Sequence, residues 1–479
     1  MFTDVSGLIA PNPPGLHYGA AALDVDGDGQ IEFFVAGFGH PNRVLKWVGG
    51  ALRVVTPPVL ADPDRQAVGV AAGDLDGDGR EEVYVLNTDT FTGPKQFADR
   101  LFDPRPDGGW DDLFARPGNR AARNLAAGRS VAAIDRRGTG RYGFVAASYG
   151  RPMRLYELAP DGRLADVAPG LVLDRTTGGR GLWVGPLVSE RSDLFCVNEH
   201  GPNFLFRNRG DGTFDEVAAE YRLADADEHG RGVAALDADG DGRLDLAWGN
   251  WDGPHRLMLR QVDGTFRDRA TPALALPGAV RTVIAADFDN DGFEELFFNN
   301  LGEPNRLFGL RPTTQNAKGK TQKGEEAPPP FCVLPFAFCL LDCGAAAEPD
   351  GLGTGAAVAD IDGDGRLELL IAHGESTVQP LSLFKWPDAG HGWLRVRPLT
   401  RFGAPARGAR VRLIAAGRAQ LRVIDGGSGY LCQMEPVAHF GLGAVGEVEE
   451  VVVTWPDGAR QVVQRPAVRE EIVVAYPGG

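Results

Sequence analysis

Residues 24–32 read DVDGDGQIE, and four further segments repeat the same nine-position pattern, D-x-D-x-D-G-x-x-[DE]. The five copies begin at Asp24, Asp74, Asp237, Asp287 and Asp360. Each copy sets carboxylates at alternate positions before a glycine that permits a sharp turn. So many negative charges in a short loop repel one another unless a cation lies between them, and calcium takes roughly six to eight oxygen ligands. The pattern therefore predicts up to five calcium loops.

The position of each residue in the loop predicts its role. Side-chain oxygens at positions one, three, five and nine should bind the ion, and the backbone carbonyl at position seven should join them. The predicted ligands are Asp24, Asp26, Asp28, Gln30 and Glu32; Asp74, Asp76, Asp78, Arg80 and Glu82; Asp237, Asp239, Asp241, Arg243 and Asp245; Asp287, Asp289, Asp291, Phe293 and Glu295; and Asp360, Asp362, Asp364, Arg366 and Glu368. These loops are not EF-hands, because that motif needs a glutamate at position twelve. The chain has there Val35, Val85, Trp248, Phe298 and Ile371.

The residues around each loop are typical of buried strands. Residues 31–35 after the first loop are rich in β-formers, and residues 19–22 before it are small. Small side chains suit strands that crowd around a central axis. One acidic loop alone could be a solvated turn, but five copies in matching context favour metal binding.

The loops recur at a nearly fixed interval. Asp24 and Asp74 are 50 residues apart, as are Asp237 and Asp287, and two degenerate copies begin at Asp135 and near Gly185. Seven units of this length, each with several short strands, predict an all-β fold with a seven-bladed β-propeller. The N-terminal residues match the outer strand of another unit, so we expect them to close the ring by joining the last blade.

Two segments depart from the repeat. We interpret residues 311–346 as an insertion in a propeller that spans residues 1–390. From residue 391 to residue 479 the chain becomes arginine-rich and alternating, which predicts a small β module without an acidic loop. Outside the predicted insertion two cysteines remain, Cys196 and Cys432, which could pair or be buried free thiols.

The charge of the chain bounds its partners and its setting. A formal charge of −16 argues against nucleic acid and anionic membranes as partners. Five bound Ca²⁺ ions would bring that charge to about −6, so the predicted sites explain much of the acidity. Millimolar calcium is an extracellular condition, which favours a secreted protein. No signal peptide precedes Met1, and we interpret this as a mature or truncated start. We expect no membrane insertion.

The repeats and the module together resemble a known family. The acidic repeats resemble FG-GAP/VCBS repeats, as in the propellers of integrin α-subunits. The C-terminal module resembles the ASPIC/UnbV module. Propeller and module in this order resemble the cartilage acidic protein family over nearly the whole chain. The residues that carry the resemblance of the module include 393–396, 400–404, 408–411, 426–430, 454–458 and the long stretch Tyr430–Gly443.

The resemblance carries its own expectations. It implies a secreted, calcium-binding protein of the extracellular matrix or cell surface. It also implies a neuronal role in axon guidance or bundling, with antagonism of the Nogo receptor. The EGF-like tail that the family leads one to expect after the module is not in this sequence.

An enzyme is the rival class. Residues 426–429, Gly-Gly-Ser-Gly, partly match a nucleophile elbow, but Tyr430 stands where that motif needs glycine, so we interpret them as a flexible turn. A calcium-dependent propeller hydrolase, such as a phosphatase or phytase-like enzyme, would need metals clustered at the channel with converging lysines and arginines. One loop per unit keeps the ions apart, which favours a structural use. We therefore expect a non-enzymatic protein that presents loops to extracellular or cell-surface partners.

Overall fold

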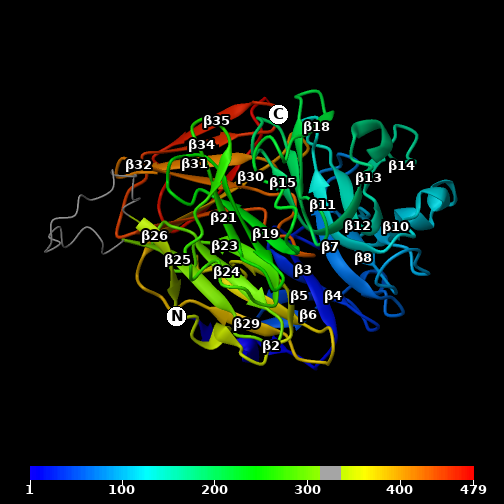
Figure 1. Ribbon diagram of the computed structural model, residues 1–479, viewed down its shortest axis with the longest axis horizontal. Helices are drawn as coiled ribbons and strands as arrows, with labels where there is room; N and C mark the ends of the chain where they lie inside the picture. Colours follow the sequence, from blue (N-terminus) through cyan, green and yellow to red (C-terminus); the bar gives the residue numbers. More distant parts are fainter. Residues whose placement is uncertain (313–335, 479) are drawn as a thin grey trace, which may run out of the picture.

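The computed structural model describes residues 1–312 and 336–478, and they form a nearly all-β protein, as predicted (Figure 1). In each repeat unit, the strand that precedes the loop lies innermost. Neighbouring inner strands contact one another in chain order, and the last contacts the first. They are β3 (His17–Leu23), β7 (Ala67–Gly73), β11 (Gly128–Ile134), β15 (Thr176–Gly185), β19 (Gly230–Leu236), β23 (Val280–Ala286) and β27 (Gly353–Ala359).

Further strands extend each unit outward as an antiparallel meander. The first three units add β4 (Glu32–Gly37), β5 (Arg43–Val48) and β6 (Ala51–Val54); β8 (Glu82–Asn87), β9 (Arg100–Pro104) and β10 (Trp110–Asp112); and β12 (Gly143–Pro152), β13 (Arg154–Leu158) and β14 (Leu164–Asp166). The next three add β16 (Asp193–Asn198), β17 (Phe204–Asn208) and β18 (Phe214–Glu216); β20 (Asp245–Asn250), β21 (Arg256–Arg260) and β22 (Phe266–Asp268); and β24 (Glu295–Asn300), β25 (Arg306–Pro312) and β26 (Phe336–Leu341). The last adds β28 (Glu368–His373) and β29 (Ser382–Lys385).

Hydrogen bonding groups these units into six sheets. Strand β12 runs on beyond its own unit and pairs with β15, so the third and fourth units share one eight-stranded sheet. In the part of the chain that the structure describes, seven inner strands surround the axis, but the number of separate blades depends on how this shared sheet is divided. The seven-bladed description therefore stays an interpretation.

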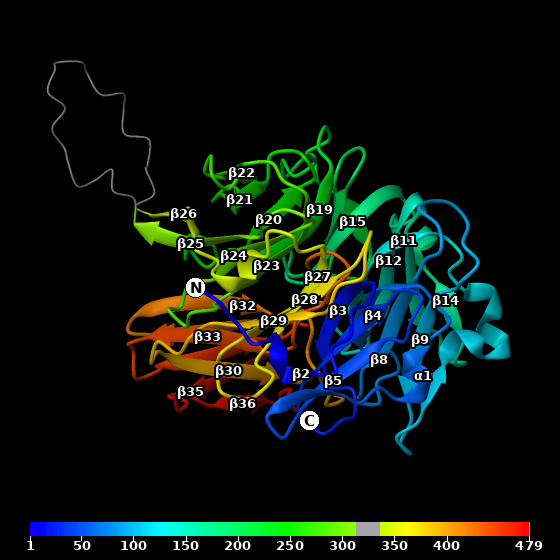
Figure 2. The same ribbon diagram turned by 90° about the horizontal axis from the view of Figure 1, so that it is seen from below.

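The N-terminus closes the ring, as predicted. Strand β1 (Thr3–Asp4) pairs with β29, with Thr3 opposite Lys385 (Figure 2). Strand β2 (Ile9–Ala10) then joins β6 in parallel. The one short α-helix of the described residues, α1 (Pro58–Ala61), and the 3-10 turns η1 (Ser6–Leu8), η2 (Leu113–Ala115), η3 (Pro117–Ala122), η4 (Ala168–Leu171) and η6 (Ala345–Ala347) connect strands.

The predicted insertion at 311–346 needs a correction. Residues 336–341 form β26, which pairs with β25 along its length and supplies the outer strand of the sixth unit. They are part of the repeat, and the sequence hid this because the Gly-Asp-Gly-Thr-Phe turn that marks outer strands in other units is missing here. The remainder of the prediction, residues 313–335, lies outside the described residues.

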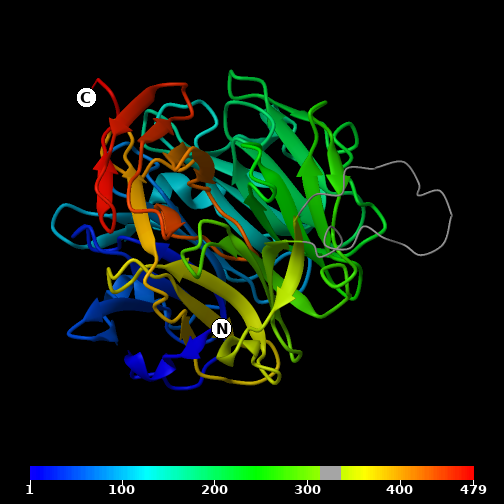
Figure 3. The ribbon, with the colours of Figure 1, turned by 90° about the vertical axis from the view of Figure 1, so that its left-hand side faces the viewer.

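The C-terminal residues form a module of two sheets. One contains β33 (Ala438–Gly443), β30 (Gly392–Pro398) and β36 (Glu471–Val474), and the other contains β32 (Arg418–Val423), β31 (Arg410–Ala415), β34 (Glu450–Thr454) and β35 (Arg460–Gln464). The module has its own core, which includes Leu394, Phe440 and Trp455. It lies against the face of the ring that carries the acidic loops (Figure 3). Module and ring therefore form one packed unit.

One loop of the module fills the channel. Residues 425–437, which we call the plug, connect β32 to β33 and run between the inner strands. The backbone of Gln433 exchanges hydrogen bonds of 3.1 Å with Ala20 and Ala22 on β3, and its side chain accepts a 2.8 Å bond from the Ala72 amide on β7. Other plug residues bond to β11, β15, β19, β23 and β27. The plug thus ties together all the inner strands.

The plug also decides the state of the cysteines. Cys432 lies in the plug and Cys196 on β16, and both are buried free thiols. Of the two alternatives for this pair, the structure shows the second. Residues 426–429, interpreted as a flexible turn, are buried backbone partners of the inner strands instead.

Candidate metal centre

All five acidic loops join an inner strand to the second strand of its unit. In the first loop, the position-one carboxylate of Asp24 accepts a 2.8 Å hydrogen bond from the amide of Gly29, and the position-nine carboxylate of Glu32 accepts one of 2.8 Å from Val25. Gly29 has a φ of 88°, a conformation that glycine adopts without strain. The equivalent glycines of the other loops have φ values from 81° to 95°. Side-chain and backbone bonds thus shape the same turn in every loop.

The turn brings some of the predicted carboxylates close together. Oxygens of three acidic side chains lie within 4.8 Å of one another in several loops. These groups are Asp24, Asp26 and Glu32; Asp74, Asp76 and Asp78; Asp237, Asp239 and Asp245; and Asp287, Asp289 and Asp291. A further group unites Asp76 and Glu82 with Asp103, a residue of β9 that the sequence prediction missed. Asp103 could have been found by aligning the repeats, because it follows Phe102, the residue that pairs with Val83 just after the loop.

The five residues at position seven, whose backbone carbonyls are predicted to bind calcium, also make contacts through their side chains. Gln30, Arg80, Arg243 and Arg366 each bind the position-five aspartate of their own loop, and the ring of Phe293 lies 3.6 Å from the guanidinium of Arg418. Their backbone carbonyls as ligands stay a prediction.

The clustered carboxylates are poorly tolerated as bare anions. Burial, together with the negative charge of neighbouring aspartates, raises the pKa of Asp74 to about 7 and that of Asp245 to about 8. The same causes raise the pKa of Glu82 well above its usual range. A bound cation would reverse this effect, because it stabilises the ionised form.

Several of these oxygens have no donor. Asp239 Oδ1, Asp287 Oδ1 and Glu295 Oε1 are buried and accept no hydrogen bond from the described residues. Asp193, at position nine of the degenerate fourth loop, is different, because Asn208, Ser189 and Val188 supply four of its donors. Hard, unpartnered carboxylate oxygens are the ligands that calcium prefers, so the residues present fit this ion.

Two loops have a lysine ammonium among their carboxylates. Lys46 Nζ lies 2.6 Å from carboxylate oxygens of both Asp26 and Asp28. Lys385 Nζ lies 2.7 Å from Asp362 and 3.0 Å from Asp364 in the last loop. The matching strand positions beside the other three loops carry Asp103, Leu259 and Gly309. Among the described residues, a lysine ammonium therefore lies among the carboxylates of the first and last loops only.

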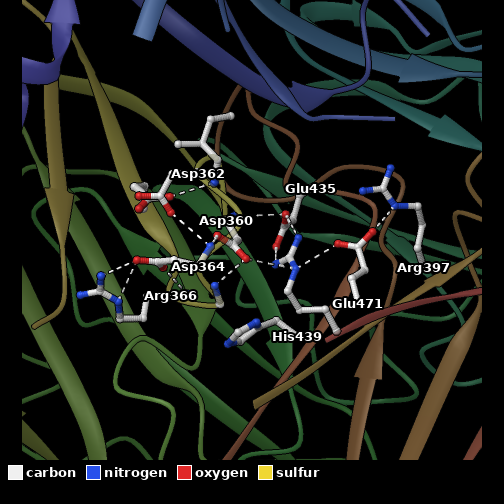
Figure 4. A network of polar contacts seen from close by, with 12 residues as sticks. Asp360, Asp362, Asp364, Arg366, Arg397, Glu435, His439 and Glu471 are labelled. Atoms are coloured by element: carbon white, nitrogen blue, oxygen red, sulfur yellow. Dashed lines mark hydrogen bonds and ion pairs between the residues drawn. The ribbon is translucent and has the colours of Figure 1, made fainter. Parts of the chain in front are cut away.

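The module contacts the loops directly. Arg395 lies 3.4 Å from the position-one carboxylate of Asp360 and forms a 2.7 Å ion pair with Glu435 of the plug (Figure 4). The amide of Gly441 donates a 2.9 Å bond to the position-one carboxylate of Asp287. The loops thus hold the module as well as their own turns.

Comparisons with known proteins agree with this architecture. The family of FG-GAP-like repeats matches residues 24–85, 190–248 and 237–298, and the family called ASPIC and UnbV matches residues 400–479. Cartilage acidic protein 1 of Xenopus tropicalis is 47% identical, and the match covers 100% of this chain and 77% of that protein. The chain belongs to the cartilage acidic protein family. Human cartilage acidic protein 1 is 46% identical over 96% of this chain and 72% of its own length.

A lectin from Burkholderia pseudomallei aligns with 77% of this chain and 98% of its own, with 14% identity and a TM-score of 0.47. Among the residues that the structure describes, no helix is long and apolar enough to cross a membrane. The family, the repeats and the module are thus established.

Proposed function

We propose that this member of the cartilage acidic protein family is a calcium-dependent, non-enzymatic interaction protein. The observation that carries the proposal is the set of buried carboxylate oxygens without donors, at Asp239, Asp287 and Glu295. Calcium held by the five loops would neutralise carboxylates that otherwise repel one another. It would thereby stabilise the ring and the module docked on it.

The loops would not bind calcium equally. The loops at Asp74, Asp237 and Asp287 have no lysine from the described residues among their carboxylates and are proposed as the tighter sites. The loops at Asp24 and Asp360 each contain a lysine ammonium, which competes with the ion for the same oxygens. We thus propose five calcium sites, as the sequence predicts, in two affinity classes of three tighter and two weaker sites.

The setting and partners follow from this dependence. Sites of this kind suit the millimolar calcium outside cells. The proposed partners are extracellular or cell-surface proteins, with the Nogo receptor as the candidate that the family resemblance provides. Nucleic acid is disfavoured as a partner by the charge of −16.

The rival hydrolase lacks support from the geometry. The plug occupies the channel, where such an enzyme would gather its metals. Arginines do converge near the axis, but around Tyr430, at the starts of the inner strands, whereas the acidic loops follow the ends of those strands. The arginines around Tyr430 are thus at the opposite end of the channel from the metal loops, and Arg395, which reaches the Asp360 loop from the module, is already paired with Glu435 of the plug.

The proposal is tested by melting the calcium-stripped protein with and without added Ca²⁺, and by assaying phosphate-ester hydrolysis on the same samples. We expect a higher melting temperature with Ca²⁺ and no turnover above a buffer control. Ca²⁺-dependent turnover would favour the hydrolase. An unchanged melting temperature would contradict calcium binding by the loops.

A further inference from the structure

Four arginines lie at equivalent places in successive units. Arg129, Arg180, Arg231 and Arg281 are 50 or 51 residues apart, and they lie near the starts of β11, β15, β19 and β23. The strand register shifts at or beside each of them. Such bulges change the direction in which a side chain points. The repeat thus places four cations at the end of the channel away from the acidic loops.

The arginines converge on the tip of the plug. Arg180 Nη1 donates a 3.1 Å hydrogen bond to the hydroxyl of Tyr430. Although burial opposes its ionisation, the charges of the four arginines lower the pKa of Tyr430 below its usual value. We call these four residues and Tyr430 the arginine ring.

The positive charge of the arginine ring is not fully balanced. Glu199 pairs with Arg180 at 2.7 Å and with Arg231 at 2.6 Å, and Glu375 pairs with Arg281 at 2.9 Å. The described residues supply no ion pair to Arg129, whose Nη2 donates to the carbonyl of Phe91. Four guanidinium groups thus face two carboxylates, in a chain whose overall charge is strongly negative.

The imbalance is buried. The exposed fraction is 8% for Arg129, 3% for Arg180, 4% for Arg231 and 8% for Arg281. The Nε atoms of Arg129, Arg231 and Arg281 are buried without an acceptor from the described residues. An uncompensated buried charge is strongly destabilising, so an anion at this place would stabilise the fold.

Aromatic rings hold the guanidinium planes. The guanidinium groups of Arg231 and Arg281 lie 5.2 Å and 4.7 Å from the centre of the Trp251 ring. The guanidinium group of Arg180 lies 4.8 Å from the centre of the Tyr149 ring. Stacking occupies the face of a guanidinium and leaves its in-plane N–H groups for oxygen acceptors. The preferred partners of such N–H groups are carboxylate, phosphate and sulfate oxygens.

We propose that the arginine ring is a binding site for a small oxyanion, of the sulfate or phosphate type. A doubly charged anion matches the two positive charges that Glu199 and Glu375 leave uncompensated. The oxyanion comes either as a free ion or as the ester group of a sugar. The site does not depend on the acidic loops, because its ligand has the opposite charge and its residues lie at the other end of the inner strands.

The test uses the full chain with Ca²⁺ present and sodium sulfate titrated at constant ionic strength. We expect a saturable rise in melting temperature and a change in tryptophan fluorescence, with a sulfated monosaccharide as a second titrant. Binding of both titrants would show that the site accepts the oxyanion both as a free ion and as a sugar ester. Binding of sulfate alone would restrict it to the free ion. A response to neither titrant would overturn the proposal.

Variants test whether sulfate binds at the arginine ring. Arg281→Gln should weaken sulfate binding at least tenfold, whereas Arg460→Gln, on the exposed strand β35, should leave it unchanged. Glu375→Gln removes a competing carboxylate and should tighten binding several-fold, which keeps the proposal testable if the arginine variant does not fold. Equal sulfate binding by all three variants would overturn the proposal.

Discussion

At the residue scale, the five acidic loops differ in the cation nearest to their carboxylates. Lys46 lies among the carboxylates of the first loop, 3.2 Å from Glu32. Replacing Lys46 by Met removes the competing charge, so the Ca²⁺ affinity of this loop should rise roughly tenfold, or about 1.4 kcal/mol. Calorimetric titration measures the change. Arg53→Met, at the exposed partner of Lys46 on β6, is the control and should have no such effect. Weaker or unchanged binding in the Lys46 variant would show that the lysine does not compete.

A second residue-scale prediction concerns the carboxylate oxygens without donors. Asp239→Asn should reduce Ca²⁺ affinity at its loop by at least roughly tenfold, because an amide is a weaker ligand than a carboxylate. Asp211→Asn removes the same charge from an exposed hairpin turn and should have little effect. Calcium titration of the two variants side by side decides the matter. An equal loss of Ca²⁺ affinity in both variants would show that only the overall charge of the protein matters.

The raised carboxyl pKa values predict a pH dependence. The pKa values of Asp74 and Asp245 are raised to about 7 and about 8, above the values near 4 expected in the unfolded chain. Without calcium, these two carboxyl groups therefore bind more protons in the folded protein than in the unfolded chain between pH 4 and 8. Burial lowers the pKa of His255 to about 4, which acts in the opposite direction below about pH 6.5. The free energy of unfolding should therefore fall as the pH rises from about 6.5 to 8. Ca²⁺ affinity should rise over the same window, because the ion displaces these protons. Melting curves of stripped protein at several pH values provide the test, and a flat profile would refute it.

At the scale of elements, the plug should stabilise the ring through Gln433. Its side chain accepts from the Ala72 amide at 2.8 Å and donates to the carbonyls of Ala72 and Gly426 at 3.0 Å and 2.9 Å. Gln433→Ala would leave buried groups unpaired, at a cost of about 3 kcal/mol. Denaturant unfolding measures this loss. Gln464→Ala, on an exposed strand, is the control, and an equally small change in both variants would mean that the plug is not held by this residue.

How far the elements were predictable depends on whether their signal was local. The acidic loops and the N-terminal strand β1 carry their patterns in the sequence, and the structure contains both. Strand β26 was missed because its turn signal is absent. The plug was missed because residues 426–429 owe their order to partners on strands far away in the chain, which no local pattern reveals. Asp103 and Lys46 become visible only when the third strands of the units are aligned.

At the scale of the whole molecule, the acidic loops connect the ring to the module. Position-one carboxylates of Asp287 and Asp360 contact both their own turns and the module. The sequence predicted both parts and their order, but their docking depends on surfaces that meet only after each part has folded. Calcium in the loops is thus proposed to stabilise one continuous assembly rather than separate blades.

The most direct test of this account is calorimetric titration of the chelator-stripped chain with Ca²⁺, followed by melting at each stage. We predict about five ions in two classes, three tighter and two weaker, with a large rise in melting temperature as the tighter class fills. A stripped protein that takes up no Ca²⁺ and melts at the same temperature with and without it would contradict the central claim.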